Sequence, residues 1–263
     1  ELKGKTVLVT HEQGFGDMIQ FARYLPMVKA RGGTVIVEVQ PELARLMSTV
    51  AGVDRAINRG QPLPEFDFYL PMMSLAHVFE TDAGSIPADV PYLAAPDPQA
   101  VQLPANLGSM KRIGIAWAGR PTHRNDRNRS TGFRHFIELL GLPGVSMFSL
   151  QKGPASSEIA ELGCESLVTD LGGRLKDFAD TAAVVSQLDL IVTVDTALAH
   201  LAGALGKPVW IALPFAPDWC WMRGRSDSPW YPSARLFRQK RPGAWEGVFG
   251  DIRRALRDEI VGG

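Results

Sequence analysis

Short apolar runs alternate with amphipathic stretches along both halves of the chain. In the first half, β-branched and aromatic runs predict four strands, over 5–10, 34–39, 54–57 and 66–70. Apolar positions spaced three, four and seven residues apart predict a helix over 17–31, and a Pro-led stretch predicts one over 41–50. Alternating strands and helices are typical of a parallel sheet covered by helices.

A proline-rich stretch interrupts this pattern. Five prolines fall between Asp82 and Pro104, as expected for an extended linker. We therefore place a domain boundary there, which gives an N-terminal domain over 1–104 and a C-terminal domain over 105–263.

The alternation resumes in the second half. Strands are predicted over 112–116, 146–149, 166–168, 190–194 and 209–212. Helices are predicted over 133–140, 156–162, 175–188, 196–205 and 248–261. The last helix could pack back on the N-terminal domain. The sequence thus predicts an α/β protein of two Rossmann-like domains with parallel sheets, and ligands are expected in the cleft at the carboxyl ends of the strands.

The charges are balanced overall but unevenly distributed. The 263 residues carry 28 basic and 28 acidic side chains, which argues against nucleic acid as a partner. Residues 1–110 hold 8 basic and 12 acidic side chains, and residues 111–263 hold 20 and 16. All six tryptophans also lie in the second part. A local anion site is therefore expected in the C-terminal domain.

The sequence contains few features that indicate a cellular compartment or a metal site. No apolar run is long enough for a membrane span, and no signal-peptide core follows Glu1. The absence of an initial Met leaves room for a longer parent protein. Cys164 and Cys220 lack metal-site or disulfide spacing, so we expect two buried thiols, no metal site and a reducing cytoplasm.

A glycine-containing loop follows the first predicted strand. Gly14 and Gly16 would let backbone amides approach a ligand, and a helix N-terminus at Asp17 adds partial positive charge. The loop lacks the third glycine of a dinucleotide fingerprint. The alternative is that Asp17 only caps the helix.

A second candidate lies where the strand over 190–194 ends. Asp195 follows the strand, Thr196 and Ala197 begin a helix, and His200 lies one turn further on the face of Thr196. Free amides at this helix start suit a phosphate oxygen. The alternative is that Asp195 is the N-cap and His200 a packing residue.

An arginine-rich loop over 118–131 also follows a strand end. It contains Gly119, Arg120, Asn125 and Arg129. Arginine's planar fork suits phosphate, and the strand-end position favours an anion clamp over a solvated loop.

Two further segments carry weaker signals. Gln151 and Lys152 follow the strand over 146–149, where backbone groups could read a base and Lys152 could meet a ribose or phosphate. The stretch 214–241 interleaves Trp, Tyr and Arg, which can bind single-stranded nucleic acid, but packing is the favoured interpretation because Trp is usually buried.

Together these segments resemble a known family. GFGD (14–17) and VDTALAHLAGALGKPVW (194–210) look like the heptosyltransferase-type glycosyltransferases of family 9. The stretches IAWAGRPTHRNDRNRST, SLQKG and DSPWYPSARLF are closer to a bacterial glycosyltransferase-like module that follows tetratricopeptide repeats.

The resemblance implies a GT-B fold and an inverting, metal-independent transfer from a nucleotide-diphosphate sugar, with no further cofactor. Asp17 matches the family's general base. Thr196, Ala197 and His200 match the element that holds the diphosphate. Arg129 stands where a lysine often sits, which leaves open which nucleobase the donor nucleotide carries. The resemblance is compatible with a carbohydrate, lipid-linked or protein acceptor. It is also compatible with repeat domains that are fused to the chain or bind it as partners.

Two other functions remain open at this point. One is a non-catalytic module that binds a nucleotide sugar or a protein partner within a larger assembly. The other is a sugar-nucleotide epimerase, which would convert the donor with no acceptor present.

Overall fold

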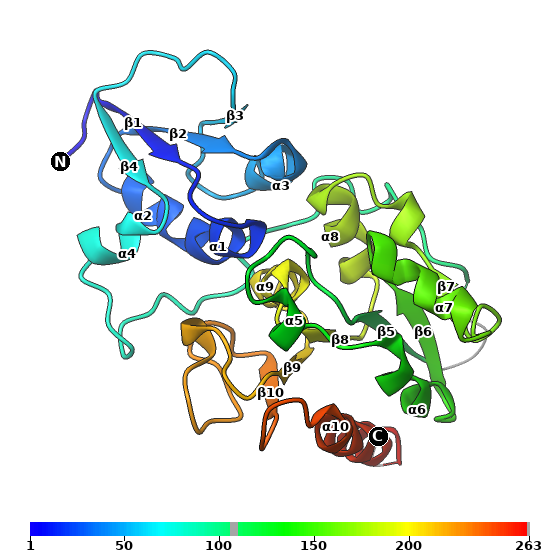
Figure 1. Ribbon diagram of the computed structural model, residues 1–263. Coiled ribbons are helices and arrows are strands. Elements are labelled where there is room, and N and C mark those ends of the chain that lie inside the picture. The colour runs from blue at the N-terminus through cyan, green and yellow to red at the C-terminus, as the bar shows by residue number, and fades with distance from the viewer. Residues whose placement is uncertain (106–109, 262–263) are drawn as a thin grey trace.

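The N-terminal half forms a parallel four-stranded sheet with strand order β3-β2-β1-β4. The computed structural model describes residues 1–105 and 110–261 (Figure 1). The strands are β1 (Thr6–Thr10), β2 (Thr34–Val39), β3 (Arg55–Asn58) and β4 (Phe68–Pro71). They lie within one or two residues of the predicted runs, because apolar β-branched side chains bury on a sheet.

Short helical segments connect these strands. They are α1 (Phe15–Phe21), η1 (Ala22–Tyr24), α2 (Leu25–Lys29), η2 (Pro41–Leu43), α3 (Ala44–Met47) and α4 (Ser74–Val78). The predicted helix over 17–31 is thus three consecutive segments, with a 3₁₀ turn in the middle. Helix α4 was not predicted.

The C-terminal half forms a larger parallel sheet, with order β10-β9-β8-β5-β6-β7. The strands are β5 (Lys111–Ala116), β6 (Val145–Ser149), β7 (Val168–Asp170), β8 (Leu190–Val194), β9 (Val209–Leu213) and β10 (Ala234–Arg238). Strand β7 begins two residues later than predicted, and Leu167 before it is exposed. Strand β10 was not predicted, since it lies inside the Trp- and Arg-rich stretch.

The helices of this half cover both faces of its sheet (Figure 1). They are α5 (Asp126–Arg129), η3 (Phe133–His135), α6 (Ile137–Leu140), η4 (Pro154–Ser157), α7 (Glu158–Glu161), η5 (Gly172–Arg174), α8 (Phe178–Ser186), α9 (Ala197–Ala204), η6 (Trp219–Trp221) and α10 (Trp245–Val261).

The suggestion that the last helix packs back on the N-terminal domain is wrong. Helix α10 packs on β9, β10, η3 and α6 of its own half. Its apolar stripe, including Phe249 and Ile252, is buried in one cluster with Phe136 and Trp210. That cluster offers the stripe a nearer apolar surface than the N-terminal sheet does.

The two halves pack tightly against each other. Helix α1 lies directly on α9, and a single apolar cluster includes residues of both sheets. The proline-rich segment follows this interface, where the Tyr92 amide donates to the Ala204 carbonyl at 3.1 Å. Buried Arg23 crosses the interface, with Nη1 donating to the Pro87 carbonyl at 2.7 Å and the Trp230 carbonyl at 2.8 Å.

Candidate active site at the domain interface

The strand orders place three of the predicted segments at one location. In the C-terminal sheet the order of the strands reverses between β5 and β8, and in the N-terminal sheet it reverses between β1 and β4. Crevices at the carboxyl ends of strands open at such switch points. Ala116 pairs with Thr193, so the arginine-rich loop and the start of α9 leave the sheet side by side. The glycine loop after β1 reaches them because α1 packs on α9.

Asp17 has a structural role at the start of α1. Gly14, not Asp17, is the N-cap, and its amide donates to Asp17 Oδ2 at 2.9 Å, so Asp17 supports the helix start from the third helical position. Gln13 before it has a φ of 60°, a left-handed conformation that turns the loop into the helix. The Asp17 side chain is only partly buried, so it stays accessible while it accepts from the Gly14 amide.

The surroundings of Asp17 raise the pKa of its carboxyl. Burial is the main cause, and the negative charge of Asp218 adds to it. The Gly14 amide and the charge of His123 act in the opposite direction. Asp218 and His123 belong to two different loops of the C-terminal domain. Asp17 therefore faces both loops across the interface.

Thr196, not Asp195, is the N-cap of α9. The Asp195 carboxylate instead accepts a hydrogen bond from Trp221 Nε1 at 2.7 Å, and burial raises its pKa. The alternative that Asp195 caps the helix is thus wrong. The amides of Ala197 and Leu198, at the first two positions of α9, have no acceptor within the helix and can bind an anion.

His200 is held inside the interface. Its Nδ1 lies 3.0 Å from the Tyr231 hydroxyl, and its ring stacks on Trp221 with centroids 5.0 Å apart. Burial lowers its pKa to about 3, so the imidazole is neutral near pH 7. His200 is therefore a packing residue, as the alternative stated, and it also lies beside Gly16 at the start of α1.

Arg129 is the arginine of the loop that reaches α9. Its Nη1 donates to the Asp195 carbonyl at 3.1 Å, and its Nε lies 3.5 Å from Asp126 Oδ1. Nε is buried and has no hydrogen-bond partner. A Cβ on Gly119 would lie 2.6 Å from Arg129 Nη2, which explains a glycine there. A partly buried guanidinium beside a helix start is suited to an oxyanion.

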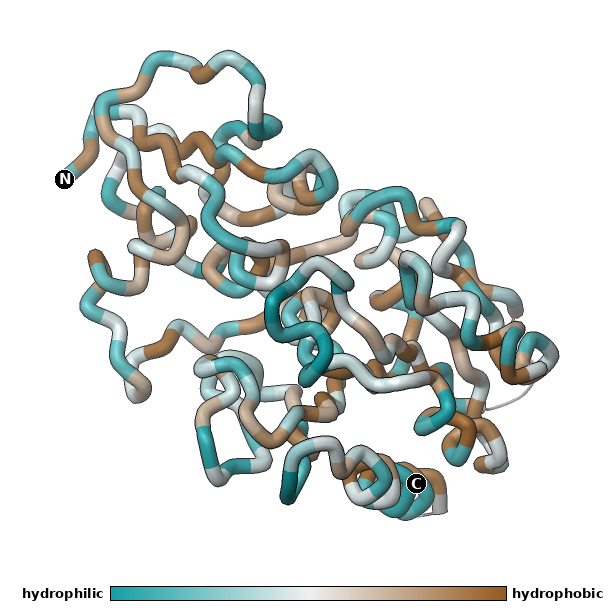
Figure 2. Tube along the Cα trace, in the orientation of Figure 1, coloured by the Kyte–Doolittle hydropathy of each residue, from teal (hydrophilic) through white to brown (hydrophobic). Residues whose placement is uncertain are grey.

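The other predicted members of this loop lie further out. Arg120 is exposed, and the loop is strongly hydrophilic (Figure 2). Asn125 accepts from Asn128 Nδ2 through its Oδ1 at 2.7 Å. A ligand contact by Arg120 or Asn125 stays a prediction.

Gln151 supports the site rather than facing it with its side chain. Its Oε1 accepts from the amides of Trp117 and Ala118 at 3.0 and 2.9 Å. Its Nε2 donates to the carbonyls of Ala118 and Lys152 at 3.1 and 2.9 Å. Both amide hydrogens are used, so the side chain cannot donate to a base. Lys152 is exposed and its Nζ donates to the Leu175 carbonyl.

Sequence reasoning missed the groups that support these residues. Asp218 and His123 influence Asp17, whereas Trp221 and Tyr231 hold Asp195 and His200. The stretch 214–241 was interpreted as packing, and Trp221, Trp230 and Tyr231 are indeed buried. Asp218 is an acidic residue inside an aromatic stretch, and that contrast was the signal that could have marked it as a site residue. Cys164 and Cys220 are buried free thiols, as predicted.

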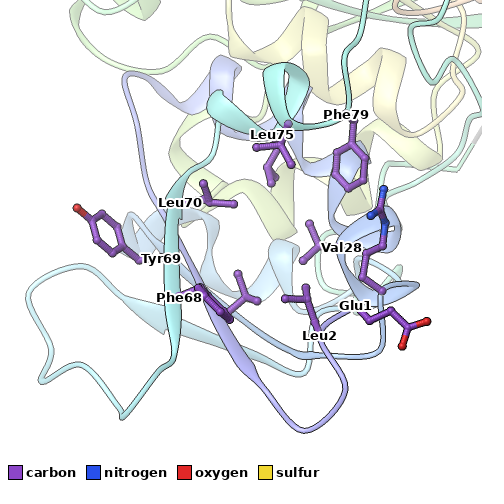
Figure 3. Close-up of a pocket in the computed structure, with 11 residues that line it drawn as sticks. Glu1, Leu2, Val28, Phe68, Tyr69, Leu70, Leu75 and Phe79 are labelled. Atoms are coloured by element: carbon purple, nitrogen blue, oxygen red, sulfur yellow. The ribbon is translucent and has the colours of Figure 1, made fainter.

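Two hollows in the surface lie elsewhere. One of about 320 Å³ is apolar and lies between β4, α2 and α4 (Figure 3). Another, of about 700 Å³, borders β6 and β7. Within residues 1–105 and 110–261, no three His, Cys, Asp or Glu side chains are placed to hold a metal ion. No helix in that part of the chain is both long and apolar enough to cross a membrane.

Comparison with known proteins is consistent with this geometry. Residues 104–217 match the family model of glycosyltransferase family 9 (heptosyltransferase). This part of the chain is therefore similar to the heptosyltransferases of glycosyltransferase family 9. The match contains the arginine-rich loop and the start of α9.

A full-length relative extends the similarity. Protein FlbA of Caulobacter vibrioides is 31% identical over 286 residues, which span 98% of this chain and 47% of FlbA. The chain thus spans about half the length of this relative.

Solved structures share the GT-B-like fold. Escherichia coli ADP-heptose lps heptosyltransferase II is 17% identical with a TM-score of 0.62, covering 97% of this chain and 99% of that one. The iron-containing dodecameric glycosyltransferase TibC of E. coli is 13% identical with a TM-score of 0.56, covering 100% of this chain and 77% of that one.

Proposed function

We propose that the chain transfers a sugar from a nucleotide-diphosphate donor to an acceptor hydroxyl, with inversion and without a metal ion. The observation that carries the proposal is the convergence of Asp17 with the start of α9 and with Arg129. A base and an anion site then meet at the domain interface. The similarity to ADP-heptose enzymes makes ADP-linked heptose the first donor to test.

The diphosphate would lie on the open amides of Ala197 and Leu198. The Arg129 guanidinium, which lies beside this helix start and also forms an ion pair with Asp126, would donate to the same oxygens. These groups are fixed in place before the ligand arrives, since Arg129 is held by the Asp195 carbonyl. They would stabilise the charge that develops as the diphosphate leaves.

Asp17 would act from the opposite side of the interface. Its carboxylate would take the proton of the acceptor hydroxyl as that oxygen forms a bond to the anomeric carbon. The bond from the anomeric carbon to the phosphate oxygen would break, and the nucleoside diphosphate would leave. Attack opposite the leaving group inverts the anomeric configuration. The raised pKa of Asp17 makes it a stronger base than an ordinary aspartate.

A thermal-shift series with ADP, GDP, UDP and their sugars tests the binding step. A ligand that binds only the folded state raises Tm according to its concentration and Kd. We expect one nucleotide class to raise Tm. If none does, the nucleotide-binding proposal is wrong, and a partner-binding module is favoured.

Turnover with the selected donor tests the rest. NMR of the product would give its anomeric configuration, and a retained configuration would contradict inversion. A chelator series tests the metal: unchanged turnover after EDTA treatment is expected. Loss of turnover that iron or another divalent ion restores would contradict metal independence. We also propose a reducing cytoplasm as the compartment, where nucleotide sugars are available.

A further inference from the structure

Trp219 is exposed although the other tryptophans are buried. Its exposed fraction is 57%, whereas the other five are at most 7% exposed. An exposed indole presents an apolar face and an N–H donor to water, a combination that is enriched at binding interfaces. The ring of Trp219 is therefore accessible to a ligand.

The ring is held rigidly. Asp218 caps η6 by accepting from the Cys220 amide at 3.2 Å, and Trp221 at the other end of η6 is anchored to Asp195. Met222 follows with φ 52° and ψ −169°, a conformation that costs a non-glycine residue free energy. Trp219 and Trp230 form a T-shaped pair with an interplanar angle of 81°. A fixed aromatic surface loses little entropy when a ligand binds.

The ring lies beside the proposed base. Its centroid is 6.4 Å from that of Phe21, which is one helical turn after Asp17 on the same face of α1. Asp218, the residue before Trp219, is close enough to Asp17 for its charge to raise the pKa of that carboxyl. An apolar platform and two carboxylates therefore border the same side of the interface.

We propose that Trp219 is the stacking platform of an acceptor subsite that binds a pyranose ring. This inference rests on the proposed function, because it takes Asp17 as the base. A pyranose presents C–H groups on its faces, which stack on an indole, and hydroxyls around its edge, which donate to carboxylates. The amides of α9 and Arg129 are assigned to the donor. The Trp219 platform next to Asp17 is thus suited to the acceptor sugar, whose hydroxyl Asp17 would deprotonate.

The test measures sugar binding without any nucleotide. Saturation-transfer NMR would use millimolar methyl pyranosides of glucose, galactose, mannose and N-acetylglucosamine. At least one should receive saturation at its ring C–H protons. The Trp219→Ala variant should bind that glycoside about tenfold more weakly or worse, as expected for loss of one stacking ring. Trp219→Phe, which keeps an aromatic face, should retain part of the affinity.

Tyr69→Ala provides the matched control. Tyr69 is an aromatic residue that is 65% exposed on β4, and it lines the separate hollow between β4, α2 and α4 (Figure 3). This variant should bind the glycoside like the unmodified chain. The proposal is overturned if no glycoside binds, or if Trp219→Ala binds as well as the unmodified chain.

The same variants separate this inference from the proposed function. Nucleotide binding by Trp219→Ala, measured by thermal shift, should be unchanged. If no nucleotide binds the unmodified chain, the proposed function fails, whereas the glycoside measurement still gives its own result. Trp219→Gln serves as a second removal of the ring should the alanine variant have a lowered Tm.

Discussion

A Cβ atom added to Gly16 would lie 2.9 Å from Cδ2 of His200. The two residues come from the two domains, and this close approach lets α1 lie on α9. His200 cannot easily move away, because Tyr231 and Trp221 hold its ring. The main role of Gly16 is thus to leave room for the close contact between α1 and α9.

Gly16→Ala should lower the free energy of unfolding by about 1–3 kcal/mol, the usual cost of overpacking. Urea denaturation would measure it. Gly247→Ala is the control, since a Cβ on exposed Gly247 of α10 meets no atom within 4 Å. That change should be neutral or stabilise by up to about 1 kcal/mol. Equal effects of both changes would contradict the tight fit at Gly16.

Asp17→Asn should abolish transfer while nucleotide binding stays intact. The asparagine Oδ1 can still accept from the Gly14 amide, so the start of α1 is preserved. Loss of a general base typically lowers the rate by about 10²–10⁴-fold. Steady-state rates and thermal shifts would check both parts. Full activity in this variant would remove Asp17 from the role of base.

The pH profile provides a second test of Asp17. A base must be unprotonated, so kcat/KM should fall as pH drops through the raised pKa of Asp17. Asp218→Asn removes the like charge that helps to raise that pKa. The acid limb should therefore move to lower pH in this variant. A limb that stays in place would mean that a different group is being titrated.

Arg129→Ala should weaken binding of the nucleoside diphosphate by about tenfold or more, since hydrogen bonds to a charged group are strong. Calorimetric titration would give the Kd. Arg127→Ala is the control, because Arg127 is exposed on the same short helix, α5. The Kd of the Arg127→Ala variant should differ little from that of the unmodified chain, and high salt should make the difference smaller still. An unchanged Kd in Arg129→Ala would contradict the clamp.

Local pattern was sufficient for much of the fold. The strands β2 and β8 have the predicted limits, because continuous β-branched runs admit few other structures. The strand β10 was missed because it follows a stretch rich in Trp and Pro. Its burial depends on pairing with β9, which the local pattern does not reveal.

The site was predicted by its segments but not by its partners. The strand-end rule placed Asp17, Arg129 and Thr196 near a cleft. It did not show that Trp221 donates a hydrogen bond to the Asp195 carboxylate, or that the Gln151 side-chain amide donates to backbone carbonyls. Such contacts join residues far apart in the sequence, so side-chain spacing along one element cannot reveal them.

The neutral His200 predicts a pH dependence of stability. Its pKa is lowered to about 3 in the folded chain, whereas an unfolded chain has the ordinary value near 6.5. Between these values the unfolded state binds the additional proton. The His200 contribution to stability is therefore complete above pH 6.5 and is lost progressively as pH falls toward 3.

His200→Gln should remove this dependence. In the unmodified chain, His200 lowers the free energy of unfolding by at most about 1.4 kcal/mol per pH unit below 6.5. Urea unfolding at pH 7 and pH 5 would give the slope for each variant. His77→Gln, which changes an exposed histidine on α4, should keep the original slope. If His200→Gln keeps it as well, His200 does not carry the effect, and its imidazole is not held neutral by burial at the interface.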